Sequence, residues 1–126
     1  MVLIFGGAYQ GKLEYTLDNF GLSEGDVYRC GENTELDLSF KVLYGLENFV
    51  MGCVKAGIEA GELLSEYGDS LTDKIIIVTD ISQGIVPMDP KDRSWREMTG
   101  RTMVYLGRRA DRVIRVFCGL VREIKG

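Results

Sequence analysis

The sequence predicts an α/β domain in which helices flank a mostly parallel β-sheet. Short apolar segments alternate with helical ones in the order strand, helix, strand, helix, strand, helix, strand. Residues 74–79 (KIIIVT) form a continuous β-branched run, typical of an interior strand covered on both faces. The chain has 126 residues, 45% of them hydrophobic. That is enough to build one core, so we expect a single domain over residues 1–126.

The first third of the chain predicts a strand, a tight turn, a helix and a second strand before a polar loop. We expect these elements at residues 1–5, at Gly6 and Gly7, and at residues 12–20, 26–30 and 31–39.

A long amphipathic helix is predicted from Leu46 to about Gly68, because apolar residues recur there every three or four positions. Gly52, Gly57 and Gly61 interrupt the pattern, and each costs a helix about 1 kcal/mol relative to alanine. We therefore expect close packing or a kink at these glycines.

The last third of the chain predicts a buried strand at residues 74–79, followed by Asp80 and a loop to residue 90. A helix at residues 92–109, with Trp95 as a core anchor, and a final strand at residues 112–118 complete the fold. Ligands of parallel sheets bind beyond the C-terminal ends of the strands, so Asp80 is a candidate site residue.

The segment GGAYQGK after the first strand matches the phosphate-binding pattern G-x-x-x-x-G-K between a strand and a helix. Its backbone N–H groups would hold phosphate oxygens and its lysine would contact the terminal phosphates. The candidate nucleotide-binding residues are Gly6, Gly7, Ala8, Tyr9, Gln10, Gly11, Lys12 and Leu13. The alternative is a glycine turn with a purely structural role.

The position that normally supplies a Ser or Thr hydroxyl to Mg²⁺ is Leu13, which has no oxygen to offer. Any Mg²⁺ would be weakly bound or held by non-standard ligands, and the sequence does not identify them. Asp80 is either such a ligand, a general base, or a cap of the following turn.

Composition excludes several classes of function. The chain has no histidine, so a Ser-His-Asp triad or a phosphohistidine is impossible. The formal charge is −4 and the arginines are scattered, which argues against nucleic acid as a partner. No apolar run approaches the length of a membrane span, so we expect no membrane association and a cytoplasmic location. The three cysteines, Cys30, Cys53 and Cys118, lack a paired motif and are expected to be buried thiols.

The chain resembles the bifunctional adenosylcobinamide kinase / adenosylcobinamide-phosphate guanylyltransferase family of cobalamin biosynthesis. The resemblance lies in residues 6–12, Gly84-Ile85-Val86-Pro87, Trp95-Arg96-Glu97, Gly100-Arg101, Ala110-Asp111 and Cys118-Gly119-Leu120.

The resemblance implies a three-layer P-loop NTPase (RecA-like) fold that binds ATP or GTP with Mg²⁺ and forms homo-oligomers. It implies that a corrinoid alcohol is phosphorylated, with Lys12, Asp80 and Arg101 as catalytic residues and Arg96 as an alternative to Arg101.

This chain also departs from the family pattern. Guanylyl transfer through a histidine is excluded, and the family's acidic strand appears at residues 42–45 without its carboxylate. Two functions remain open: an adenosylcobinamide kinase-like enzyme, and a non-catalytic nucleotide- or corrinoid-binding regulatory or partner protein derived from it.

Overall fold

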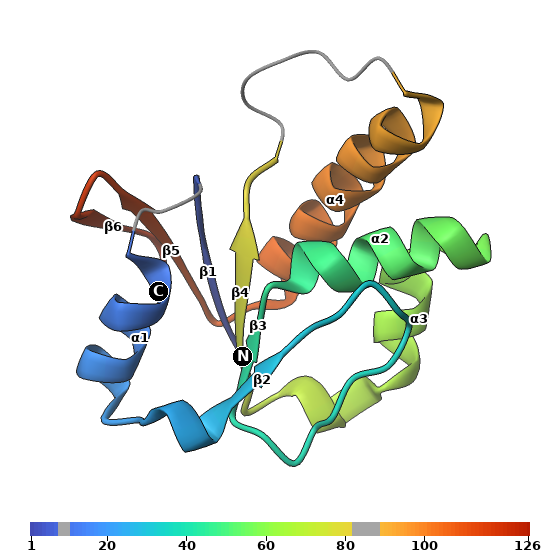
Figure 1. Cartoon of the computed structure of the whole chain (residues 1–126). Helices are drawn as coiled ribbons and strands as arrows, with labels where there is room; N and C mark the ends of the chain where they lie inside the picture. The colour runs from blue at the N-terminus through green and yellow to red at the C-terminus, as the bar shows by residue number, and fades with distance from the viewer. Residues whose placement is uncertain (8–10, 82–88) are drawn as a thin grey trace.

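The computed structural model describes residues 1–7, 11–81 and 89–126 (Figure 1). The strands are β1 (Val2–Gly6), β2 (Val27–Arg29), β3 (Val42–Tyr44), β4 (Ile75–Thr79), β5 (Arg112–Phe117) and β6 (Leu120–Lys125). The α-helices are α1 (Lys12–Phe20), α2 (Leu46–Ala56), α3 (Ala60–Glu66) and α4 (Pro90–Arg109), and there are short 3₁₀ turns at Glu24–Asp26 and Gly68–Leu71.

The strands form one sheet in the order β2-β3-β4-β1-β5-β6. Every neighbouring pair is parallel except β5 and β6, which form an antiparallel hairpin at one edge. The predicted α/β class with a mostly parallel sheet is therefore confirmed.

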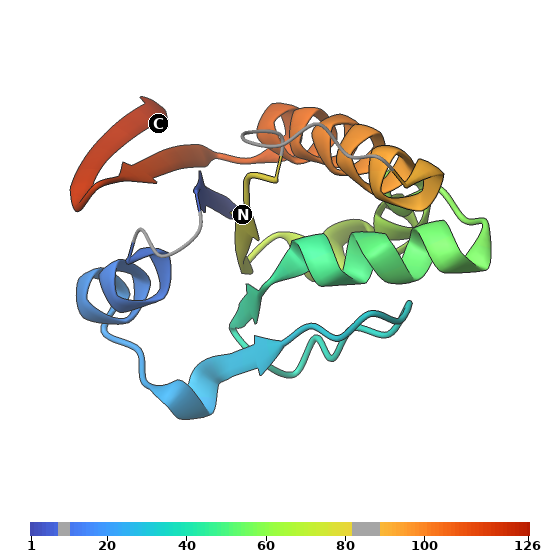
Figure 2. The same ribbon diagram turned by 45° about the horizontal axis from the view of Figure 1, so that its top comes forward.

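Helices cover both faces of the sheet because the central strands are apolar on both sides. In β4, Ile76 and Val78 pack toward α2, α3 and α4, whereas Ile75 and Ile77 pack toward α1. Figures 1 and 2 show α1 alone on one side of the sheet and the other three helices on the opposite side. The arrangement has three layers, with β1 and β4 at its centre.

The helix expected at residues 46–68 is two helices, with the break at one of the three glycines. Gly57 adopts a left-handed conformation (φ 71°) that ends α2. Gly52 remains helical but packs against backbone, since a Cβ there would lie 2.4 Å from backbone atoms of Asn33. Both expected effects therefore occur: the helix breaks at Gly57, and Gly52 allows close packing.

The C-terminal hairpin was not predicted. Cys118 and Gly119 have positive φ values of 49° and 76°, as two-residue hairpin turns require, and the chain then returns as β6. The burial expected for Cys118 is wrong: its residue is exposed in this turn, whereas Cys30 and Cys53 are buried. All six residues of β6 are exposed, so no buried face imposed a strand pattern on its sequence.

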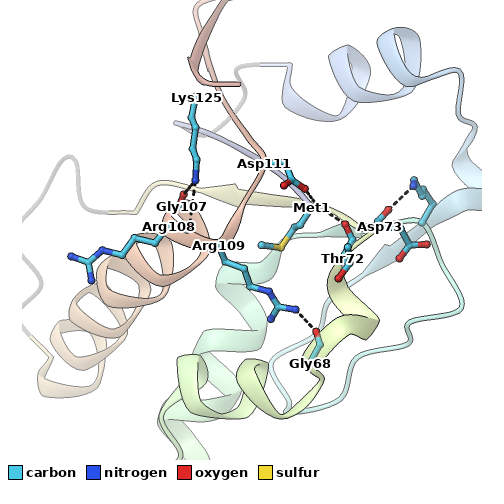
Figure 3. Close-up of polar contacts among 10 residues, drawn as sticks. Met1, Gly68, Thr72, Asp73, Gly107, Arg108, Arg109, Asp111 and Lys125 are labelled. Atoms are coloured by element: carbon cyan, nitrogen blue, oxygen red, sulfur yellow. Dashed lines mark hydrogen bonds and ion pairs between the residues drawn. The ribbon is translucent and has the colours of Figure 1, made fainter.

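Main-chain carbonyl groups at the amino ends of the central strands are paired with basic side chains (Figure 3). The Nζ of Lys125 donates to the carbonyl oxygens of Gly107 and Arg108, each at 3.2 Å, at the C-terminus of α4. Arg109 donates to the carbonyl oxygen of Gly68. The carbonyl oxygens of Gly68, Gly107 and Arg108 therefore each accept a hydrogen bond from a basic side chain at this end of the sheet.

Candidate functional site

The chain changes direction across the sheet between β1 and β4, which are neighbours. From β1 it runs through α1 to β2 at one edge, and from β4 it runs through α4 to β5 on the other side of β1. Ligand sites of open α/β sheets lie at the carboxyl ends of strands at such a point. Gly6 pairs with Thr79 there, and the backbone N–H of Asp80 donates to the Gly6 carbonyl oxygen at 2.8 Å. The glycine loop and Asp80 are therefore adjacent.

Lys12 is a buried cation at this point. It is the first residue of α1, is 5% exposed, and donates from Nζ to the carbonyl oxygen of Gly7 at 2.7 Å. Burial lowers the pKa of the Lys12 ammonium, while the negative charges of Glu47 and Glu14 act in the opposite direction. Gly11 precedes the helix with φ 77°, which favours glycine. The lysine charge is thus held near the strand ends, where the hydrogen-bond acceptor among the described residues is a neutral carbonyl oxygen.

Glu47 is a site residue that sequence reasoning missed. Left-handed Gly45 (φ 77°) turns the chain from β3 into α2 and places Glu47 in the first helical turn. Its Oε1 accepts from the Thr79 backbone N–H at 2.9 Å, and its carbonyl oxygen accepts from Trp95 Nε1 at 2.7 Å. A carboxylate two residues after a strand-ending glycine was the available signal.

Glu47 changes the interpretation of residues 42–45. The strand itself carries no carboxylate, as expected, but the first turn of the next helix delivers one to the same edge of the sheet. Trp95, expected as a core anchor, packs against the core and also holds the backbone of Glu47.

The remaining described loop residues have structural roles as well. Leu13 packs against the apolar cluster beneath α1, so it brings no oxygen to the site. The buried Thr16 one turn later donates its hydroxyl to the Lys12 carbonyl oxygen at 2.7 Å. A Cβ on Gly6 would lie 2.1 Å from the Val116 carbonyl oxygen, so strand packing alone requires a glycine there.

The two candidate arginines lie on different sides of α4. Arg96 lines a cavity with Asp80, and both residues are half-buried. Arg101 instead forms a two-point ion pair with Glu59, from Nε and Nη2 at 3.1 Å each, which raises the pKa of its guanidinium. The structure brings Arg96 to Asp80 and does not bring Arg101 there.

Several predicted site residues lie outside the described residues. These are Ala8, Tyr9 and Gln10 of the loop and Gly84-Ile85-Val86-Pro87 of the family resemblance.

Within residues 1–7, 11–81 and 89–126, no group of three or more His, Cys, Asp or Glu side chains could hold a metal ion. Glu47 and Asp80 offer carboxylates at the site, and Mg²⁺ is commonly held by one or two carboxylates together with substrate phosphates. The donor set thus fits Mg²⁺ only in company with a bound phosphate compound.

Comparison with models of known protein families and with curated proteins finds no match to this sequence. None of the helices in the described part of the chain is both long and apolar enough to span a membrane.

Proposed function

We propose that this protein binds a nucleoside triphosphate, ATP or GTP, at the loop of residues 6–12 in a P-loop (RecA-like) fold and transfers its terminal phosphoryl group to an alcohol. The observation that carries the proposal is Lys12: a buried ammonium with a lowered pKa that donates to the Gly7 carbonyl oxygen at the strand ends. A bound phosphate group would add negative charge beside this desolvated cation and form charge-assisted hydrogen bonds with it.

The chemistry follows from the neighbouring groups. The acceptor oxygen forms a bond to the terminal phosphorus, the bond from that phosphorus to the bridging oxygen breaks, and the nucleoside diphosphate leaves. Asp80 takes the proton of the acceptor hydroxyl, and Lys12 and Arg96 face the developing charge. Arg96 takes the role that the sequence offered to Arg101, because Arg101 is paired with Glu59.

Mg²⁺ would be held by Glu47 and by phosphate oxygens, and would neutralise charge on the transferred group. Glu47 would replace the hydroxyl that Leu13 does not provide. The family resemblance makes a corrinoid alcohol, as in an adenosylcobinamide kinase, the first acceptor to test.

A second candidate function is non-catalytic nucleotide or corrinoid binding by a regulatory or partner protein. Leu13 favours it, because its side chain is committed to the core where an active enzyme places a metal-binding hydroxyl.

Calorimetric titration with ATP and GTP, with and without Mg²⁺, tests both functions. Kinase function predicts triphosphate binding that Mg²⁺ strengthens and that Lys12→Met weakens by roughly 10- to 100-fold. Binding that is independent of Mg²⁺ would favour the second function. Absence of nucleotide binding would refute the kinase and the nucleotide-binding form of the second function.

A further inference from the structure

A cavity of about 200 Å³ lies beside the proposed phosphate site, lined by residues at the end of β4 and on α4. Its lining residues are Asp80, Ile81, Arg96, Thr99, Gly100 and Met103. The four residues from α4 are spaced by three and four positions, so one face of this helix forms a wall of the cavity. Asp80 lies at the other side, immediately after β4.

Thr99 contributes a buried polar group that is unpaired within the described residues. It is 2% exposed, and its Oγ1 has no hydrogen-bond partner in the described part of the chain. By contrast, Thr102 on the same helix is also buried, but its hydroxyl donates to the Met98 carbonyl oxygen at 2.7 Å. A buried hydroxyl left unpaired destabilises the protein unless a ligand completes it.

Gly100 keeps the wall open. It lies inside α4 without a left-handed conformation, and a Cβ at this position would meet nothing within 4 Å. Neither backbone conformation nor packing requires a glycine here, although glycine weakens a helix by about 1 kcal/mol relative to alanine. Gly100 is exposed and lines the cavity, so a Cβ there would project into open space at the cavity wall.

Most of the cavity surface is apolar, and two of the residues that line it, Arg96 and Asp80, are charged. Arg96 is half-buried and forms no ion pair or hydrogen bond with the described residues, so its guanidinium can take a carboxylate. Asp80 also lines the cavity, and a carboxylate oxygen has more than one lone pair with which to accept a hydrogen bond from a hydroxyl, while Ile81 and Met103 supply apolar surface. The volume equals roughly six or seven waters at about 30 Å³ each, below the range of drug-sized sites.

We propose that this cavity binds a short-chain hydroxy acid of three or four carbons. Its carboxylate lies on Arg96, its hydroxyl faces Asp80, and one of its oxygens completes the hydrogen bonding of Thr99. A role for this compound as phosphoryl acceptor in place of a corrinoid alcohol rests on the proposed function, whereas its binding does not.

The test uses three probes with the same three-carbon skeleton: lactate, propane-1,2-diol and 1-amino-2-propanol. Each is titrated into the ¹⁵N-labelled full chain, and the amide resonances of residues 96–103 are followed by NMR. We expect saturable shifts with lactate at millimolar concentration and binding at least about tenfold weaker for the diol and the amine. Equal or tighter binding of the amine, or no saturable shift with lactate, would overturn the proposal.

Matched variants tie binding to the cavity. Arg96→Met and Gly100→Ala are each expected to weaken lactate binding at least about fivefold. Arg108→Met and Gly107→Ala make the same changes elsewhere on α4, where a Cβ on Gly107 would lie an ordinary 4.0 Å from Leu3 and Arg108 is exposed. If the control pair weakened lactate binding as much as the cavity pair, the assignment would be wrong. Thermal unfolding and NMR spectra of each variant establish that it is folded.

Nucleotide titrations of the same samples keep the two proposals separate. Lactate binding that depends on Arg96 supports the cavity proposal whether or not ATP binds. ATP binding without lactate binding overturns the cavity proposal and leaves the proposed function standing.

Discussion

The hydrogen bonding of polar groups differs between the two ends of the central strands. At the amino ends, Lys125 and Arg109 donate to main-chain carbonyl oxygens at the C-terminus of α4 and in the turn before β4 (Figure 3). At the carboxyl ends, Lys12 is buried with a lowered pKa, and the Thr99 hydroxyl has no partner among the described residues. The hydrogen bonds at the amino end stabilise the fold. The carboxyl end instead has polar groups to which a bound ligand would form hydrogen bonds.

This difference has a testable consequence. Removing a polar group at the amino end should cost stability, whereas removing one at the carboxyl end should cost ligand binding and leave the fold as stable or more stable.

Substitution of Gly6 should cause the largest loss of stability. Gly6 lies at the carboxyl end of β1, where the close approach of Val116 leaves no room for a Cβ. Gly6→Ala places a Cβ 2.1 Å from the Val116 carbonyl oxygen, and we expect a loss of about 3 kcal/mol in the free energy of unfolding measured with urea. Gly11→Ala, whose Cβ would meet only Glu14 at 3.9 Å but whose φ is 77°, should lose about 1 kcal/mol. Equal losses of stability in the two variants would show that packing against β5 is not the reason for a glycine at position 6.

Lys12→Met should abolish most nucleotide binding without lowering stability at pH 7, since it replaces a desolvated charge with an apolar chain of similar length. Because the pKa of Lys12 is lower in the folded state than in the unfolded state, the wild type gains stability as pH rises toward 10.5. Lys12→Met lacks this gain.

Two buried thiols act in the opposite direction over the same pH range. Burial raises the pKa of Cys30 to about 12 and of Cys53 to about 11, so the stability that they contribute is lost as pH rises above about 9. They are present in both proteins, so the difference in urea stability between wild type and Lys12→Met, measured from pH 7 to 10.5, isolates the lysine. A difference that does not vary with pH would contradict the assignment.

Thr99→Val should raise the free energy of unfolding by about 1 kcal/mol, because an unpaired buried hydroxyl becomes a methyl group. The matched Thr102→Val removes a hydroxyl that is hydrogen-bonded to Met98 and should be neutral or destabilising. Chemical denaturation of the two variants compares them directly, and a Thr99→Val protein less stable than wild type would refute the contrast between the two ends.

Lys125→Met should give the smallest effect, a loss of about 0.5 kcal/mol, because an exposed cation near the C-terminus of a helix contributes only a few tenths of a kcal/mol. Nucleotide and lactate binding should be unchanged. A loss of ligand binding in this variant would mean that the two ends are coupled.

Sequence reasoning placed the residues that follow strands better than those on helices. Asp80 and the glycine loop follow neighbouring strands at the same end of a parallel sheet, so the contact of Asp80 with Gly6 agrees with the topology expected. Arg96 and Arg101 could not be distinguished, because the choice depends on which face of α4 meets β4 and which meets Glu59. Glu47 was missed because its role depends on the turn made by Gly45.

The sequence by itself determined the α/β class, the buried β4 strand, the glycine loop before α1 and the absence of histidine chemistry, since these depend on local pattern and composition. Only the tertiary structure decided the break at Gly57, the exposed β6 hairpin, and the meeting of Asp80 with Arg96 and Thr99. These features depend on contacts between residues distant in the chain, whose burial and pairing free energies exist only once the sheet and helices pack together.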